Sequence, residues 1–345
     1  ATGNEILKVE DVVKIFLSDE TFDKFSKSVV ADDYNYINRE KNYINHQSNN
    51  TKEDKNNGSK VNKKTRINST NSLNKKFSLI IIAETKDYMI INKPVGMLSQ
   101  KAKGSDISLV EYIVAYMLDK GEIDNKQLQT FKPSVCNRLD RNTSGVIIAG
   151  KSLIGLQKMT EYIKNRDIDK YYLALVKGKI TKGDKIDGYL VKDSDSNTVK
   201  VIKSTSKVID FNENKRMDSR GNGTKNNKQN KNENEIKLDY IKTEYEPVSY
   251  NDNYTLLKVK LITGKTHQIR AHLSSINHPI IGDYKYGDRT INDKFKKKYK
   301  LESQLLHSYE VVFNNNDEDI LKVKGKVYQA ELNEVFKKIV EDLIL

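Results

Sequence analysis

The chain has 345 residues, room for about two domains, with 37% hydrophobic and 31% charged residues and no apolar run near the ~18 residues of a membrane span. A single cysteine excludes an internal disulfide, and the first residues lack the basic-then-apolar pattern of a secretory signal, so we expect a cytoplasmic protein. The net charge of +13 favours a polyanionic partner, although two tracts, residues 41–76 and 212–236, carry nine of these charges.

The N-terminal part of the chain has little apolar periodicity. Residues 5–17 form two short β-like pieces, and half of residues 41–76 are Asn or Lys, so we interpret residues 26–76 as a linker or disordered insertion. Residues 212–236 have a similar composition and are predicted to be a long, disordered hairpin insertion. Such a tract can act as a flexible cationic arm, or it can be a biased stretch with no specific role.

From Phe77 onward the chain carries dense strand and helix signals. β-branched and aromatic residues predict strands over residues 77–84, 87–94, 170–180, 255–264, 304–313 and 326–332. Helical spacing of apolar residues, with a serine cap before the second segment, predicts helices over residues 108–121, 152–165 and 265–277. Because strands outnumber helices and two sequential hairpins can be drawn, the predicted fold class is mixed α+β rather than a doubly wound parallel sheet.

Metal and nucleotide chemistry have little support in the sequence. His267 and His272 are five residues apart, so on the predicted helix they point away from each other, and no carboxylate completes a ligand set. Neither of the common glycine-rich phosphate loops is present. Cys136 has no histidine near it in sequence and is predicted to be a packed residue. We therefore expect neither a metal ion nor a cofactor.

Asp140 is the strongest candidate for chemistry. It stands between Arg138 and Arg141 in "NRLDRNTSG", at a turn that opens into the apolar segment 146–149. The turn could be a surface feature with a local ion pair. Alternatively, the two guanidinium groups favour an ionised carboxylate, which suits nucleophilic attack or stabilisation of a developing cation better than acid catalysis.

The Asp140 turn also resembles a known family signature. "NRLDRNTSG" is similar to the H-R-L-D-x-x-T-S-G motif of the RluA family of pseudouridine synthases, with Asn137 in place of the usual first histidine. Four further segments resemble motifs of that family in the same order: "DYMIINKPVGMLSQ", "DKYYLALVKGKI", "TGKTHQIRAHLSSINHPIIGDYKYG" and "LLHSYEVVF". The resemblance covers residues 77–345 outside the 212–236 insertion.

The resemblance implies a fold and a reaction. The family core is a mixed, mostly antiparallel, bent sheet with flanking helices and a central RNA-binding cleft, which we expect over residues 77–345. Residues 1–25 resemble the tail of a small alpha-L RNA-binding module, so we expect an incomplete module there. The implied reaction isomerises uridine to pseudouridine within RNA without a metal ion or cofactor: the N-glycosidic bond breaks, the uracil turns, and its C5 bonds to the sugar.

Three residues have catalytic roles if the resemblance holds. Asp140 is the implied nucleophile or stabiliser of a cation-like intermediate. Tyr172 matches the family tyrosine, which can stack on the sugar and remove its C2′ proton, and Arg270 matches the residue that pairs with the carboxylate. The predicted helix carries Arg270, with His267 and Ser274 along the same side, and it would have to meet the Asp140 turn in space.

The substrate-binding candidates surround these three residues. Arg138 matches the family arginine that fills the gap left by the target nucleotide, whose extrusion from the stack costs a few kcal/mol. The other candidates are Leu139, Arg141, Lys93 and His267. For Lys93, contact with the RNA backbone and a purely structural role both remain open.

The leading functional hypothesis is an RNA pseudouridine synthase that acts as a monomer on large-subunit ribosomal RNA, away from any membrane. Transfer RNA is the competing substrate. A second hypothesis is a non-catalytic RNA-binding or ribosome-assembly factor, which would have no need of a carboxylate facing phosphates. A third, a carboxylate-based glycosidase, would require a second acid at a suitable separation, and the sequence offers none.

Overall fold

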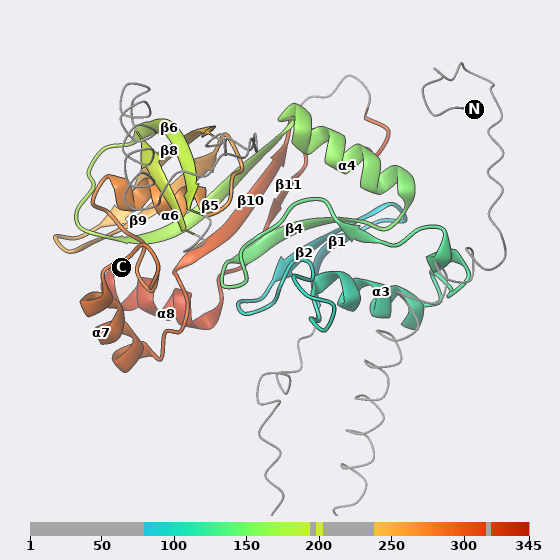
Figure 1. Cartoon of the computed structure of the whole chain (residues 1–345), viewed down its shortest axis with the longest axis horizontal. Helices are drawn as coiled ribbons and strands as arrows, with labels where there is room; N and C mark the ends of the chain where they lie inside the picture. Colours follow the sequence, from blue (N-terminus) through green and yellow to red (C-terminus); the bar gives the residue numbers. More distant parts are fainter. Residues whose placement is uncertain (1–78, 194–197, 203–237, 315–318, 345) are drawn as a thin grey trace, which may run out of the picture. The chain divides into compact units, whose positions relative to one another are not determined.

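The computed structural model describes residues 79–193, 198–202, 238–314 and 319–344 (Figure 1). Three predicted segments lie outside these ranges: the module remnant at residues 1–25 with its β-like pieces, the linker at 26–76 and the insertion at 212–236. In the described part of the chain, no helix is long and apolar enough to cross a membrane.

Eleven strands form one sheet in the order β1-β2-β4-β10-β5-β9-β8-β6-β7, with β11 paired to β10 and β3 paired to β4. The strands span Ile80–Glu84 (β1), Tyr88–Lys93 (β2), Ser134–Val135 (β3), Ser144–Gly150 (β4), Ile168–Lys177 (β5), Asp184–Asp193 (β6), Thr198–Ile202 (β7), Leu238–Tyr250 (β8), Tyr254–Leu261 (β9), Leu306–Phe313 (β10) and Val327–Gln329 (β11). Every ladder is antiparallel except the short pairing of β4 with β10. The predicted α+β class, with a mostly antiparallel sheet, is confirmed.

The described helices span Leu109–Asp119 (α3), Leu153–Asn165 (α4), Gln268–Ser275 (α6), Arg289–Tyr299 (α7) and Glu334–Leu343 (α8), with a 3-10 turn at Gln127–Gln129 (η1). The serine cap predicted for the second helix is present, because the Ser152 hydroxyl accepts a hydrogen bond from the Gly155 amide at 3.0 Å. Residues 114–132 are the described part of one of the two compact units of the chain. Within them, the side chains of Asp124 and Gln127 accept hydrogen bonds from each other's backbone amides at 2.7 and 2.9 Å.

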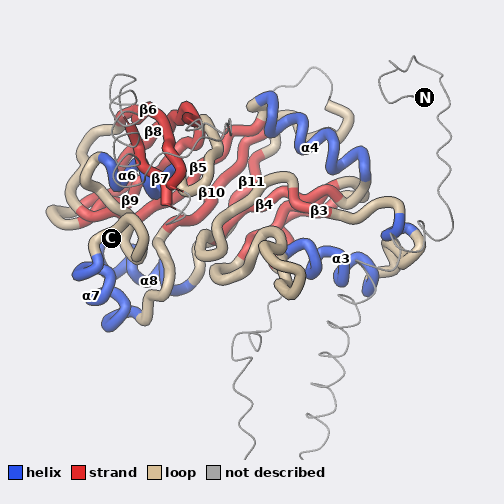
Figure 2. The backbone as a smooth tube through the Cα atoms, viewed as in Figure 1, coloured by secondary structure: helices blue, strands red, loops and turns tan. Residues whose placement is uncertain are grey.

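Figure 2 shows the helices and strands along the backbone. Apolar clusters pack α4, α6, α7 and α8 on the sheet at three places. α4 packs through Met159 on β2 and β4. α7 and α8 pack through Phe295 and Phe336 on β5 and β9. α6 packs through Ala271 on β6, β7 and β8. α6, which carries Arg270, is therefore fixed to the half of the sheet opposite the end that β1 and β2 form.

β10 connects the two parts of the sheet that carry the candidate site. Ser308 of β10 pairs with Gly145 of β4 on one side and with Tyr172 of β5 on the other. β4 begins a few residues after Asp140, so the register of a single strand sets the spacing between the Asp140 turn and Tyr172.

His307 of β10 lies where this strand pairs with Ser144 of β4. His307 is fully buried, and its ring nitrogens bond the Ser144 hydroxyl at 2.8 Å and the Ala330 carbonyl at 3.0 Å. Burial lowers the pKa of His307 to about 4, although the bond to Ala330 opposes this shift. The ring is therefore neutral near pH 7 and can donate to the carbonyl while accepting from the hydroxyl.

The insertion at residues 212–236, predicted to be a hairpin, lies outside the described residues. It connects β7 to β8, and these strands lie on either side of β6: Ile202 pairs with Tyr189, and Leu238 pairs with Val191. The two described strands that flank the insertion therefore both pair with a third strand, β6, and not with each other.

The two helices α7 and α8 were not predicted from the sequence. In α7 the buried or half-buried residues Ile291, Phe295 and Tyr299 recur every four residues, but lysines dominate the segment between them. Such a narrow apolar stripe is enough to seat a helix on a sheet, although it is easily mistaken for a solvated loop.

We expect Gly145→Ala to destabilise the fold severely. Gly145 has φ 110°, and a Cβ there would collide with the backbone of Ser308, which cannot move without breaking the β4–β10 pairing. The loss should be about 3 kcal/mol or more, read as a lower urea midpoint. Gly325→Ala is the matched control, because Gly325 also has positive φ (72°) but open space around it, so only ~1 kcal/mol should be lost. Equal losses in both variants would contradict the collision.

Candidate active site

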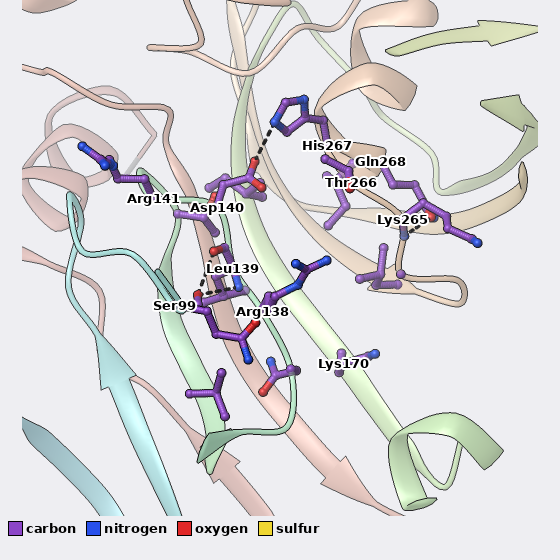
Figure 3. Close-up of a pocket in the computed structure, with 18 of the residues that line it drawn as sticks. Ser99, Arg138, Leu139, Asp140, Arg141, Lys170, Lys265, Thr266, His267 and Gln268 are labelled. Atoms are coloured by element: carbon purple, nitrogen blue, oxygen red, sulfur yellow. Dashed lines mark hydrogen bonds and ion pairs between the residues drawn. The ribbon is translucent and has the colours of Figure 1, made fainter. Parts of the chain in front are cut away.

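Hydrogen bonds hold the Asp140 turn on both sides, and Figure 3 shows those from Ser99. The Ser99 hydroxyl accepts a hydrogen bond from the Leu139 amide at 3.0 Å and donates to the Leu139 carbonyl at 2.8 Å. The Asp140 carbonyl accepts from the Thr143 amide at 3.1 Å, and the Thr143 hydroxyl accepts from the Gln304 side chain at 3.0 Å. Leu139 is buried within this network, and the turn is held in place by the protein alone.

Lys93 supports the turn from inside the protein. Its side chain is fully buried, and the ammonium donates to the carbonyl oxygens of Pro94 (2.9 Å), Met97 (2.9 Å) and Arg141 (3.2 Å). Burial lowers the pKa of Lys93 to about 7, with the charge of Asp140 opposing the shift. Three carbonyl acceptors match the three N–H bonds of an ammonium group. Of the two roles left open for Lys93, contact with RNA and a structural role, these contacts favour the structural one.

Arg270 is the guanidinium that holds Asp140. Its Nη1 donates to Asp140 Oδ2 at 2.8 Å, between residues 130 positions apart in sequence. The neighbouring Arg138 and Arg141 are exposed, and within the described ranges neither forms an ion pair with Asp140. The guanidinium bonded to Asp140 therefore comes from α6, and the helix and the turn do meet, as the predicted pairing requires.

The other two nitrogens of the Arg270 guanidinium bond Asp283, which lies in the connection between α6 and α7. Arg270 Nε donates to Asp283 Oδ2 at 2.7 Å and Nη2 to Oδ1 at 2.9 Å, and the amides of Lys285 and Tyr286 also donate to Oδ1. Asp283 is 1% exposed. Burial alone would raise the pKa of Asp283, but the bonds and charge of Arg270 and the two amides outweigh burial and lower it.

His267 precedes α6 rather than lying inside the predicted helix. It has φ 55°, a conformation that costs a non-glycine residue about 1 kcal/mol or more. Its Nε2 lies 3.8 Å from Asp140 Oδ2. Burial lowers the pKa of His267, and the opposing charge of Asp140 does not restore it, so the ring is neutral near pH 7. His267 is therefore a polar neighbour of Asp140 and not a second cation.

Tyr286 gathers the three side chains predicted to share one side of the helix. Its hydroxyl bonds His267 Nδ1 at 2.9 Å, its ring centre lies 5.2 Å from the Arg270 guanidinium carbon, and its carbonyl accepts from the Ser274 hydroxyl at 2.8 Å. The same hydroxyl accepts from the Val199 amide of β7 at 3.0 Å. Tyr286 thus connects α6 to the β6–β7 edge of the sheet.

Tyr172 faces the pocket from β5, and only 5% of it is exposed. Burial raises the pKa of Tyr172 to about 12; the Ser308 hydroxyl opposes the shift and the charge of Asp140 adds to it. The phenol is therefore neutral near pH 7. Tyr171 points to the opposite face of the sheet, where the Lys258 ammonium lies 4.6 Å from its ring centre. The two adjacent tyrosines therefore lie on opposite faces of β5.

The segment that enters the Asp140 turn is held to β4. Asn137, which replaces the family histidine, accepts a hydrogen bond from the Ile148 amide at 2.8 Å through its side-chain oxygen. Cys136 lies beside it, and burial raises the pKa of its thiol to about 12, which makes the thiol a poor nucleophile. An amide is sufficient for the anchoring role that Asn137 performs.

These residues line a cavity of about 720 Å³ with an uneven charge balance. Its cationic lining residues are Lys101, Arg138, Arg141, Lys170, Lys265 and Arg270, against a single carboxylate, Asp140. Among the residues that the structure describes, no group of three or more His, Cys, Asp or Glu side chains could hold a metal ion. The cavity therefore suits an anionic, flat ligand held by arginine, lysine and aromatic groups.

Three residues of this site were not predicted from the sequence: Asp283, Tyr286 and Lys170. Asp283 and Tyr286 lie in "PIIGDYKYG", and Lys170 begins "KYYLALV", so both segments had been noticed. The available signal for Asp283 was a lone acid after Gly282, whose positive φ of 83° turns the chain. For Lys170 it was the two-residue spacing to Tyr172, which puts both on one face of a strand.

Comparison with known proteins agrees with this geometry. A family model described as RNA pseudouridylate synthase matches residues 87–275. The ribosomal large subunit pseudouridine synthase C of Buchnera aphidicola is 29% identical over 290 residues, which are 82% of this chain and 76% of the relative. The ribosomal large subunit pseudouridine synthase D of Borreliella burgdorferi is 26% identical over 276 residues, 77% of this chain and 73% of the relative.

A solved structure shares the fold. Human RNA Pseudouridylate Synthase Domain Containing 4 superposes with a TM-score of 0.55 at 20% identity, over 76% of this chain and 92% of that one. At this identity the likeness supports the architecture of the sheet and its helices.

We expect Asp283→Asn to lower the free energy of unfolding by about 3 kcal/mol at pH 7, because it removes a buried carboxylate from a buried guanidinium. The folded pKa of Asp283 is lowered, so its contribution is present above the unfolded value of about 3.9 and is lost as the pH falls through the folded value. Urea unfolding at pH 7 and pH 3 should therefore show the difference between wild type and variant shrinking in acid.

Asp239→Asn is the control for that experiment. Asp239 pairs with Lys265 at 2.7 Å near the surface, so its loss should cost at most about 1 kcal/mol. A variant at Asp283 no less stable than the one at Asp239 would mean that the buried pair contributes nothing to the fold.

Proposed function

Because this chain belongs to the RNA pseudouridylate synthase family, we propose that it converts specific uridines of large-subunit ribosomal RNA to pseudouridine. Family membership makes the chain an RNA pseudouridine synthase, and RNA its substrate. The ribosomal substrate is supported by the names of two relatives that align with three quarters of their length. The reaction breaks the bond from uracil N1 to the ribose C1′ and the C5–H bond, and it forms a C5–C1′ bond and an N1–H bond, so the composition does not change.

The observation that carries the mechanism is the pair formed by Asp140 and Arg270. One oxygen of Asp140 is bonded to Arg270 at 2.8 Å, while Arg270 is itself fixed by Asp283, so the other oxygen can face a substrate in the cavity. We propose that this carboxylate attacks the sugar or base, or stabilises the cation-like sugar that forms when the glycosidic bond breaks. Its orientation is set before binding, which lowers the entropic cost of reaction.

Tyr172 is proposed to act on the sugar beside Asp140. As a neutral phenol it can stack on the ribose and donate a hydrogen bond. To act as a base toward the C2′ proton, the phenol must give up its own proton, and burial and the charge of Asp140 both oppose the formation of a free phenolate. Proton removal by Tyr172 would therefore have to be concerted with transfer of the phenolic proton to another group.

Four other residues are proposed to bind the substrate. Arg138 is exposed and lies in the cavity with no described ion pair, which suits insertion into the gap left by an extruded uridine. His267 can hydrogen-bond the base, Leu139 gives the cavity an apolar wall, and Arg141 is exposed at the rim, where it can contact phosphate.

The competing proposals differ in substrate or in turnover. A transfer RNA could supply the same extruded uridine, and the cavity does not distinguish the two. A non-catalytic binding factor would gain nothing from an oriented carboxylate facing phosphates, which disfavours it. We also propose that the protein acts as a monomer in the cytoplasm: the proposed mechanism requires no group from a partner copy, and a single cysteine fits a reducing compartment.

We expect Asp140→Asn to abolish pseudouridine formation, by about a thousandfold or more, because the amide keeps the shape but cannot act as a nucleophile or anion. The dissociation constant for RNA should change little. The measurement is carbodiimide-based primer-extension mapping on a large-subunit ribosomal RNA transcript, with filter binding for affinity. Glu331→Gln, which removes an exposed carboxylate outside the cavity, is the matched control. Turnover by Asp140→Asn near that of the control would overturn the assignment.

We expect Tyr172→Phe to reduce kcat by roughly a hundredfold with little change in KM, because only the hydroxyl is removed and stacking remains. Tyr171→Phe makes the same chemical change on the opposite face of β5 and should leave kcat near the wild-type value. Single-turnover rates of pseudouridine formation measure both. A normal rate for the Tyr172 variant would restrict this residue to stacking.

A further inference from the structure

The cavity has a second end that the proposed chemistry does not use. In Figure 3, Asp140 and His267 lie at one end and Lys170 at the other, with Arg138 between them. Lys170 is two residues before Tyr172 in β5, so both side chains point to the same face of the sheet. The register that brings the tyrosine into the cavity therefore brings the lysine as well.

Lys170 is half-buried and has no partner in the part of the chain that the structure describes. The carboxylate of the cavity, Asp140, is bonded to Arg270, and the neighbouring Lys265 has its own carboxylate, Asp239, at 2.7 Å. Burial lowers the pKa of Lys170, and no nearby charge opposes that shift. Its ammonium is the one cation of the cavity that combines substantial burial with the lack of an anionic neighbour among the described residues.

A half-buried ammonium without an anion costs free energy that a bound anion would recover. The cavity lining carries six cations and one carboxylate, so the missing partner is an anion rather than a neutral group. Uracil and ribose are neutral, and the anions of RNA are its backbone phosphates. Lys170 lies away from Asp140, which fits a phosphate outside the reacting nucleoside.

We propose that Lys170 binds the backbone phosphate of a nucleotide next to the target uridine, with Arg138 beside it, while the target sugar lies at the Asp140 end. This inference rests on the proposed function for the identity of the RNA. The phosphate contact fixes the register of the RNA strand in the cavity, so that one sugar is presented to Asp140. Lys170 is thus a binding residue that positions the substrate.

The test uses the trinucleotide UpUpU and two analogues in which either linkage is a neutral methylphosphonate, with binding measured by NMR titration at low salt. In the wild-type protein we expect one of the two neutral linkages to weaken binding about tenfold. Lys170→Gln should weaken binding of unmodified UpUpU by a similar factor, and the same neutral linkage should then cost little more. Lys170→Arg should keep most of the affinity, because the charge remains.

Lys164→Gln is the matched control, since it removes one exposed cation from α4, outside the cavity lining. Uridine, which has no phosphate, should bind the wild type and the Lys170→Gln variant equally. Three outcomes would overturn the proposal: a Lys170→Gln variant that behaves like the control, a neutral-linkage penalty as large in that variant as in the wild type, or inorganic phosphate binding as tightly as UpUpU.

Kinetics on a ribosomal RNA transcript give an independent measure. Lys170→Gln should raise KM about tenfold and change kcat much less, because the phosphate contact is present in both the ground state and the transition state. The trinucleotide titration measures binding and needs no turnover. If the wild-type protein formed no pseudouridine, the proposed function would be refuted, but the titration would still test the phosphate site.

Discussion

The guanidinium of Arg270 binds two carboxylates, and the geometry of the site depends on which of its nitrogens bonds which carboxylate. Three of its nitrogens are committed: Nε and Nη2 to Asp283, and Nη1 to Asp140. Asp283 removes the freedom of the side chain and offsets part of its charge, so Asp140 meets a cation that points in one direction. Because α6 is packed on β6, β7 and β8, this bond also ties the Asp140 turn to that part of the sheet.

The Asp140 turn is equally constrained from its other side. Ser99 holds Leu139 through both backbone groups, and Lys93 places a buried ammonium against the carbonyl that follows Asp140 by one residue. The turn therefore has little room to relax when the carboxylate changes its bonding. Such preorganisation is the condition under which a charged group stabilises charge that develops during a reaction.

Local sequence predicted the elements whose signals are local. β2 and β5 are dense in β-branched and aromatic residues, and α4 begins at its serine cap, so their positions could be predicted from the sequence. The catalytic candidates came from a resemblance, and the geometry agrees with the pairing of Asp140 and Arg270. Adjacency in the sequence does not identify the partner of Asp140: Arg138 and Arg141 flank it in the chain, yet the guanidinium bonded to it comes from a helix far along the sequence. The burial of Lys93 and Asp283 could not be read either, because burial of a charged group depends on partners that only the folded chain brings together.

The pairing scheme of the sheet also determines where this chain can change length during evolution. The ladders that join β6 to β7 and to β8 are complete without residues 203–237, so additions to that connection leave every register intact. A single added residue in β10 would instead shift Ser308 against both Gly145 and Tyr172 and reverse which side chains face the cavity. Selection should therefore tolerate insertions in the connection between β7 and β8 and remove them from β10. Related chains would then differ in length, while the spacing between the Asp140 carboxylate and the Tyr172 phenol stays constant.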